Sequence, residues 1–185
     1  FFREHLKLMS GWADVTVVFN KKLNVEIDLS DLPITIKHIH IMRKISLYWD
    51  ALSLVSLGRL FSLQHYDMVI SLTPKAGLLS MLAAKLTSIG VRLHIFQGEV
   101  WASKTGIMHV LLKAADKATA RLATNIMAVS KSQQLFLEAN RIVAKGIIKV
   151  LGEGSISGVD INKFKLDSRG RKCERLKHQI PDNAL

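Results

Sequence analysis

The chain has 185 residues, 49% hydrophobic and 22% charged, an ordinary balance for a globular protein that suits one domain with or without a tail. Its 26 Lys and Arg residues against 15 Asp and Glu give a net charge of +11, which favours phosphate-bearing partners such as anionic lipids, nucleotides or nucleic acid. The single cysteine, Cys173, excludes an intrachain disulfide and fits a reducing compartment.

Apolar, β-branched runs alternate with helical patterns along the chain. The predicted helices cover residues 1–10, 48–64, 75–88, 107–122 and 130–140, and the predicted strands cover residues 15–19, 36–41, 68–72, 91–96, 125–129 and 147–151. This alternation predicts an α/β fold, a Rossmann-like parallel sheet with helices on both faces. In such a sheet ligands bind at the carboxyl ends of the strands, so the loops that follow the strands are the candidate site.

The junction between the strand at 68–72 and the helix at 75–88 is a candidate anion site. Pro74 stands at the first helical turn, and a helix start offers free amide groups and the positive end of a dipole. Lys75 would add charge to the amides around Ala76 and Gly77. A second interpretation, in which Thr73 caps the helix and Lys75 lies in solvent, explains the same residues.

The loop after the strand at 91–96 brings a histidine, a carboxylate and a tryptophan close together in sequence. Trp101 could stack on a sugar ring or a lipid, and His94 could act as a hydrogen-bond partner or base. A packed Trp101 with Glu99 in solvent is the alternative. His38 and His40 lie two apart on one strand, but no third ligand is evident, so we expect a surface pair and no metal site.

Two further segments have a pattern of their own. The glycines of residues 152–158 resemble a dinucleotide fingerprint with the third glycine one residue late, and a polar tail follows soon after. We expect instead a loop whose backbone closely approaches a ligand or another domain. The helix at 107–122 is expected to bury the apolar stripe Ile107, Val110, Leu111, Ala114, Ala118 and Leu122.

Basic side chains recur on the other face of this helix. They are Lys113, Lys117 and Arg121, with Lys104 nearby. Such a stripe can rest on anionic lipid, or it can be a solvated face.

Taken together and in order, these loops resemble those of bacterial family 4 glycosyltransferases. The segments that carry the resemblance are residues 42–46, 71–79, 96–102, 128–133 and 152–160. The resemblance implies the GT-B architecture, with two Rossmann-like domains, and makes this chain the amino-terminal, acceptor-side half. It implies a retaining transfer that usually needs no bound metal, with a nucleotide sugar as the donor and no cofactor held by this chain.

The resemblance also implies roles for individual residues. The expected acceptor contacts are Arg43, Thr73, Lys75, Ala76, Gly77, Gln97, Gly98 and Trp101, and the catalytic candidates are His94 and Glu99. The residues expected to face the donor domain are Gly152, Gly154, Ser155, Gly158 and Asp160. Lys104, Lys113, Lys117 and Arg121 are expected at a membrane surface.

The expected organisation is an acceptor-side domain at residues 1–164, without the family's first strand, and a charged connector at residues 165–185 toward a donor domain outside the sequence. We expect binding of a lipid-linked or surface-polysaccharide saccharide in the cytoplasm, at the inner membrane face, and no activity of this chain alone. The alternative is a non-catalytic remnant or a basic module that binds phosphate, nucleic acid or a membrane surface. Nucleic acid is not expected, because aromatic residues are only 6% and no nucleic-acid-binding motif occurs.

Overall fold

The computed structural model describes residues 3–20, 29–42, 44–155, 161, 165 and 167–181. Its strands are β1 (Val15–Asn20), β2 (Ile34–Ile39), β3 (Met68–Ser71), β4 (Val91–Phe96), β5 (Asn125–Ala128) and β6 (Lys149–Val150). Its helices are α1 (Arg3–Met9), α2 (Leu47–Gln64), α3 (Pro74–Leu86), the 3-10 turn η1 (Val100–Ser103), α4 (Gly106–Leu122), α5 (Lys131–Ala139) and α6 (Ser168–Lys177). Strands and helices alternate as predicted.

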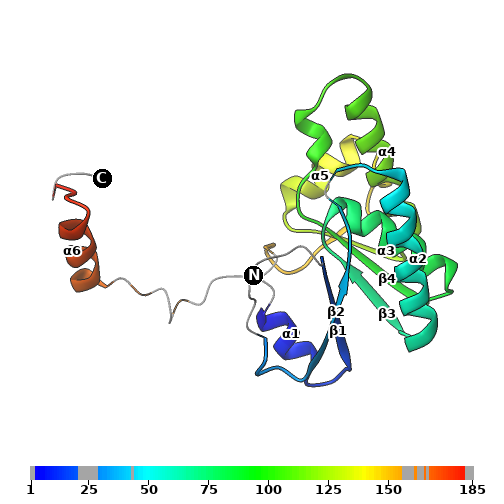
Figure 1. The fold of residues 1–185 in the computed structure, drawn as a ribbon. Coiled ribbons are helices and arrows are strands. Elements are labelled where there is room, and N and C mark those ends of the chain that lie inside the picture. The colour runs from blue at the N-terminus through cyan, green and yellow to red at the C-terminus, as the bar shows by residue number, and fades with distance from the viewer. Residues whose placement is uncertain are drawn as a thin grey trace.

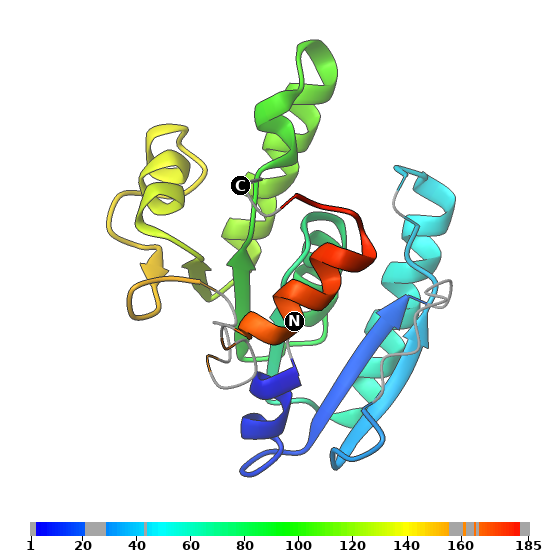
Figure 2. The ribbon, with the colours of Figure 1, turned by 90° about the vertical axis from the view of Figure 1, so that its left-hand side faces the viewer.

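The strands form two parallel sheets. One pairs β1 with β2, and the other runs in the order β3-β4-β5-β6, as Figures 1 and 2 show. In the second sheet Ser71 lies opposite His94, and Phe96 lies opposite Ala128. Neighbouring strands joined through a helix are the expected outcome of successive βαβ units. The α/β, Rossmann-like fold is therefore confirmed.

Helices lie on both faces of the β1–β2 sheet, and α2 to α5 pack against the β3–β6 sheet. Along β1, Val17 and Phe19 contact the apolar cluster that contains Leu6 of α1, whereas Val18 contacts the core beneath α2. Because successive strand residues point to opposite faces, α1 and α2 cover opposite sides of β1 and β2. The helices α2, α3 and α4 pack side by side, and α4 and α5 share one core over β5.

Several details differ from the sequence prediction. Strand β2 begins and ends two residues earlier than expected and is mostly exposed, because it pairs with β1 alone and, of its residues, only Ile39 is buried and Ile34 half-buried. Met68, the first residue of β3, is exposed, although the apolar run at residues 68–72 is typical of a strand buried on both faces. The charged segment near the carboxyl end, by contrast, has the character that its composition predicts, a linker or a lone surface helix: it contains α6, in which no residue is buried and which lies apart from the sheets in Figure 1. Within the described ranges, every helix is too short or too polar to span a bilayer.

Candidate functional site

At the carboxyl ends of β3 and β4, a buried histidine is held between two elements. The Nδ1 atom of His94 lies 2.7 Å from the Ser71 hydroxyl oxygen on the neighbouring strand. Its ring lies against Gly77 in the first turn of α3, where an added Cβ would come within 2.5 Å of the His94 Cε1 atom. The glycine is therefore what allows this strand and helix to approach.

Burial determines the charge of His94. Desolvation lowers its pKa from 6.5 to about 4, because the imidazolium would lose water without gaining a carboxylate partner. The ring is neutral at physiological pH. It can orient a neighbouring hydroxyl, but it is enclosed too deeply to reach a substrate in this conformation.

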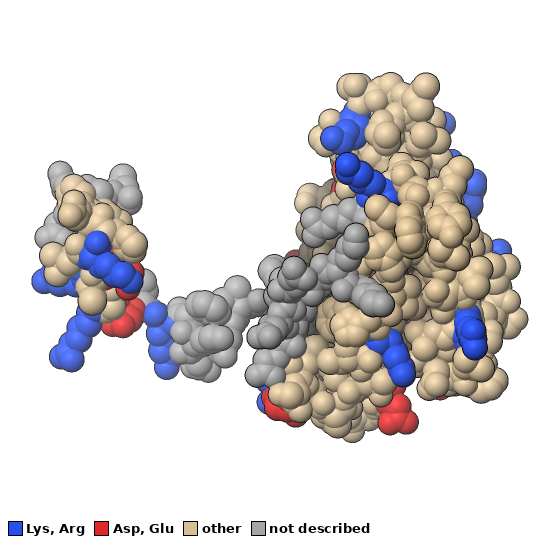
Figure 3. Space-filling model, viewed as in Figure 1, with Lys and Arg blue, Asp and Glu red and all other residues tan. Residues whose placement is uncertain are grey.

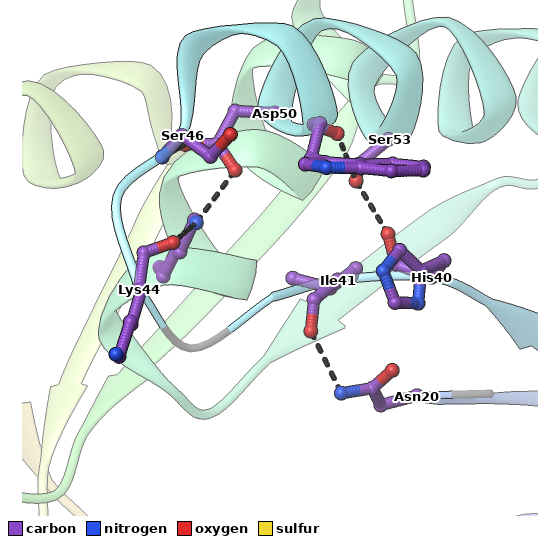
Figure 4. Close-up of polar contacts among 9 residues, drawn as sticks. Asn20, His40, Ile41, Lys44, Ser46, Asp50 and Ser53 are labelled. Atoms are coloured by element: carbon purple, nitrogen blue, oxygen red, sulfur yellow. Dashed lines mark hydrogen bonds and ion pairs between the residues drawn. The ribbon is translucent and has the colours of Figure 1, made fainter. Parts of the chain in front are cut away.

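Lys75 lies at the same edge, but its ammonium group is already occupied. Its Nζ atom is 2.5 Å from Oδ1 of Asp50 in α2 and also donates to the Lys44 carbonyl. The second oxygen of Asp50 accepts the amide of Ser46, so one carboxylate joins the start of α2, the loop before it and the start of α3 (Figure 4). Thr73 is the N-cap of α3, yet its side chain makes no capping hydrogen bond. Lys75 therefore connects the start of α3 to the start of α2 and to the loop before it.

The loop after β2 is fixed to the sheet as well. Asn20, the last residue of β1, donates its side-chain amide to the Ile41 carbonyl at 2.7 Å, and Ser53 of α2 donates to the His40 carbonyl at 2.6 Å (Figure 4). Arg43, one of the predicted acceptor contacts, lies outside the described residues.

Trp101 is buried, as its packed interpretation requires. The side chain is 2% exposed, and its Nε1 atom donates to Oδ2 of Asp116 in α4 at 2.8 Å. Burial raises the pKa of Asp116 from 3.8 to about 6, against the effect of this hydrogen bond and with a further contribution from the charge of Glu99. Lys113 lies 4.9 Å from the centre of the Trp101 ring. The indole has no open face for a ligand.

Glu99, in the loop after β4, is half-buried and is held by α5. Its Oε1 atom accepts a hydrogen bond from Nε2 of Gln133 at 2.8 Å, while Oε1 of Gln133 accepts the Val129 amide at 2.9 Å. Desolvation raises the pKa of Glu99, and the Gln133 hydrogen bond opposes that shift. Ser130 caps α5, since its hydroxyl accepts the Gln133 amide.

These groups surround a hollow of about 500 Å³ at the carboxyl ends of β4 and β5. It is lined by Gln97, Gly98, Glu99, Ala102, Val129, Ser130, Ser132, Gln133 and Phe136. Of the predicted acceptor contacts, Gln97 and Gly98 line it, whereas Thr73, Lys75, Ala76 and Gly77 lie at the neighbouring β3–α3 junction. Ser132 and Gln133 lie in a segment that carries the resemblance but had no role assigned to them, and nothing in the sequence pattern indicated Phe136, because only the packing of α5 against the β4 loop brings it to the hollow.

The glycine loop after β6 lies beside this hollow. The Ser155 amide donates to the Val129 carbonyl at 2.6 Å, and a Cβ on Gly154 would come within 2.7 Å of the same oxygen. Gly154 has φ +105, so both its conformation and its close contact require glycine. The close backbone approach that the structure shows is to Val129, the residue after β5, whereas the approach to a ligand or another domain stays a prediction. Gly158 and Asp160 lie outside the described residues.

The buried face of α4 differs from the predicted one. The residues expected to be buried are exposed at the start of the helix, with Ile107 at 80% and Leu111 at 53%. The buried residues are instead Asp116, Thr119 and Ala120. The reason is position: α4 begins beyond the strand ends at the top of Figure 1, so its first turns project past the sheet.

The predicted basic stripe is divided by the same geometry. Lys113 is turned toward the protein, where it lies over Trp101 and donates to the Asn140 side chain at 3.1 Å. Lys117 is half-buried, while Lys104 and Arg121 are exposed. Among the described residues, no group of three or more His, Cys, Asp or Glu side chains could hold a metal ion.

The comparisons with known proteins identify a relative. The capsular polysaccharide biosynthesis glycosyltransferase CapM of Staphylococcus aureus is 32% identical over 142 residues, which are 77% of this chain. This chain is related to a glycosyltransferase. The match spans 37% of the length of the relative. No protein-family model matches the chain.

Proposed function

We propose that this chain is the acceptor-binding half of a sugar-nucleotide-dependent glycosyltransferase that acts on a lipid-linked or surface-polysaccharide saccharide. The observation that carries the proposal is the match to CapM over most of the chain. The Rossmann-like fold and the hollow at the carboxyl ends of β4 and β5 support it, since α/β sheets bind ligands at that edge.

The proposal assigns the donor-binding domain to polypeptide outside these 185 residues. It takes the GT-B architecture and a retaining reaction of family 4 as its framework. The short span of the match along CapM supports this division, because a longer relative has room for a second domain. The loop at residues 152–155, beside the hollow, would face that domain.

Titration of the chain with UDP, GDP and TDP, followed by transfer assays with their sugar conjugates, tests the division. We expect no binding of the free nucleotides and no turnover, because the proposal places the donor-binding residues outside these 185 residues. Turnover of a nucleotide sugar by this chain alone would contradict the assignment of an acceptor half.

We also propose that the chain works at the cytoplasmic face of a membrane, held by the first turns of α4. Ile107 and Leu111 are exposed there, next to the exposed cation Lys104. The surface over α4 at the top of Figure 3 is mostly uncharged, with Lys and Arg side chains close by. Apolar side chains beside cations suit the boundary of an anionic bilayer. Flotation with vesicles measures this binding.

A further inference from the structure

The hollow beside β4 and β5 has an aromatic wall that the sequence pattern did not indicate. Phe136 of α5 lines the hollow and is 38% exposed. One side of its ring stacks on Trp101, with 5.4 Å between the ring centres and 19° between the planes. Trp101 is itself fixed by its hydrogen bond to Asp116. Phe136 is therefore an exposed ring on a rigid support.

A half-buried carboxylate, that of Glu99, lines the same hollow. Oε1 of Glu99 accepts a hydrogen bond from Gln133, and the backbone amide of Glu99 itself is the second donor to this carboxylate, so no side chain other than that of Gln133 among the described residues donates to it. Gln133 is in turn held by Val129 and Ser130, so the carboxylate has a fixed direction. The hydroxyl groups of Ser130 and Ser132, 2.9 Å apart, complete the polar lining.

This combination matches the surface of a neutral sugar ring. A pyranose has a face of C–H groups, which packs on an aromatic ring, and an edge of hydroxyl groups, which donate to carboxylate oxygens. Binding pockets that orient a small ligand combine apolar walls with a few fixed polar groups in the same way.

The geometry points to a pyranose subsite in this hollow, in which Phe136 stacks on the sugar ring and Glu99, oriented by Gln133, accepts its hydroxyl groups. This inference rests on the proposed function and makes it more specific. It places the sugar of the acceptor on α5 and the β4 loop, with Trp101 as the support of the platform and Glu99 as a binding group.

Saturation-transfer NMR on the 185-residue chain tests the subsite. The probes are methyl β-D-glucopyranoside and the methyl β-glycoside of N-acetylglucosamine, at millimolar concentrations. We expect saturation of the C–H protons on one ring face. Substitution Phe136→Ala should weaken binding about tenfold through loss of the stacked ring. Substitution Glu99→Gln should weaken it by about tenfold or more through loss of a charged acceptor.

Two further variants keep the test decisive. Phe136→Leu retains apolar packing against Trp101 but removes the aromatic face. It should therefore bind the sugar about tenfold more weakly than the parent chain, and it keeps the test valid if Phe136→Ala does not fold. Leu135→Ala, on the same helix and 64% exposed outside the hollow, should bind like the parent chain. Absence of saturation in the parent, or parent-like binding by both Phe136→Leu and Glu99→Gln, would overturn the subsite.

The proposed function is measured separately. A chimera in which this chain replaces the matched part of CapM reports sugar transfer. A chimera that binds the methyl glycosides but transfers no sugar counts against the proposed function alone. A different result counts against the subsite alone: the chimera transfers sugar, and its Phe136→Leu variant binds the acceptor as tightly as the chimera itself.

Discussion

His94 and Asp116 give the protein two opposing dependences of stability on pH. The folded state lowers the pKa of His94 to about 4, so the unfolded state binds more protons below pH 6.5, and stability rises with pH from about 4 to 6.5. The folded state raises the pKa of Asp116 from 3.8 to about 6, so its contribution falls with pH over that interval. The two effects partly cancel in the natural sequence.

Single substitutions should separate the two effects. In Asp116→Asn, the free energy of unfolding should rise by up to about 3 kcal/mol between pH 4 and 6.5, since one pKa unit corresponds to about 1.4 kcal/mol. In His94→Gln it should fall over a similar range. Urea unfolding at several pH values measures both slopes. Identical slopes in the two variants would show that these groups do not have the pKa values assigned to them.

Gly77 should tolerate no side chain, because His94 occupies the space. We expect Gly77→Ala to lower the free energy of unfolding by about 1–3 kcal/mol, the usual cost of overpacking. Gly58→Ala is the matched control, since its Cβ would meet nothing within 4 Å in the interior of α2. It should stabilise the protein by about 0.5–1 kcal/mol. Chemical denaturation compares them, and equal effects would contradict the described contact.

For individual residues, the sequence predicted which loops lie at the strand ends but not what each side chain in those loops contacts. Residue type and order placed Gln97, Gly98 and Glu99 at a strand end, where the structure has them. Periodicity cannot show that Trp101 is enclosed by α4 or that Phe136 stands in front of it, because both facts depend on how distant segments pack. The pairing of Lys75 with Asp50 is equally non-local.

Among the elements, α4 is where the predicted buried face was wrong. Its apolar residues do form a stripe, but over the first turns that stripe is exposed, and the polar residues Lys113 and Asp116 face the protein. A periodic pattern shows that a helix has two faces and does not show which face meets the sheet. By contrast, the strands and helices that alternate through the core were predicted nearly to their ends, because their apolar runs are bounded by turn residues.

The exposed stripe gives α4 a testable role in membrane binding. Burial of a leucine side chain contributes about 1.5–3 kcal/mol, so Leu111→Ser should weaken binding to anionic vesicles at least several-fold. Leu135→Ser is the same change at an exposed position on α5 and should have no effect. Flotation at low salt measures both variants. Equal loss in both, or no vesicle binding by the parent, would contradict docking through α4.

For the whole molecule, the division of the strands into two sheets is the main departure from a continuous Rossmann-like sheet. β1–β2 and β3–β6 are separate, yet Ile39 of β2 and Val69 of β3 belong to one core beneath α2. We propose that a further parallel strand belongs between β1 and β3. In hydrogen exchange, the amides of β1 and β3 should gain protection in a chimera that places CapM residues ahead of this chain. Unchanged protection would contradict the added strand.

Sugar transfer by the chimera with CapM tests the central claim most directly. The chain replaces the matched part of CapM, and transfer from nucleotide sugars to lipid-linked saccharides is followed by product analysis. If the chain is an acceptor-binding half, the folded chimera should transfer sugar with retention of the anomeric configuration, and Glu99→Gln should reduce transfer through weaker acceptor binding. A folded chimera that binds the nucleotide sugar but transfers nothing to any saccharide would contradict the account.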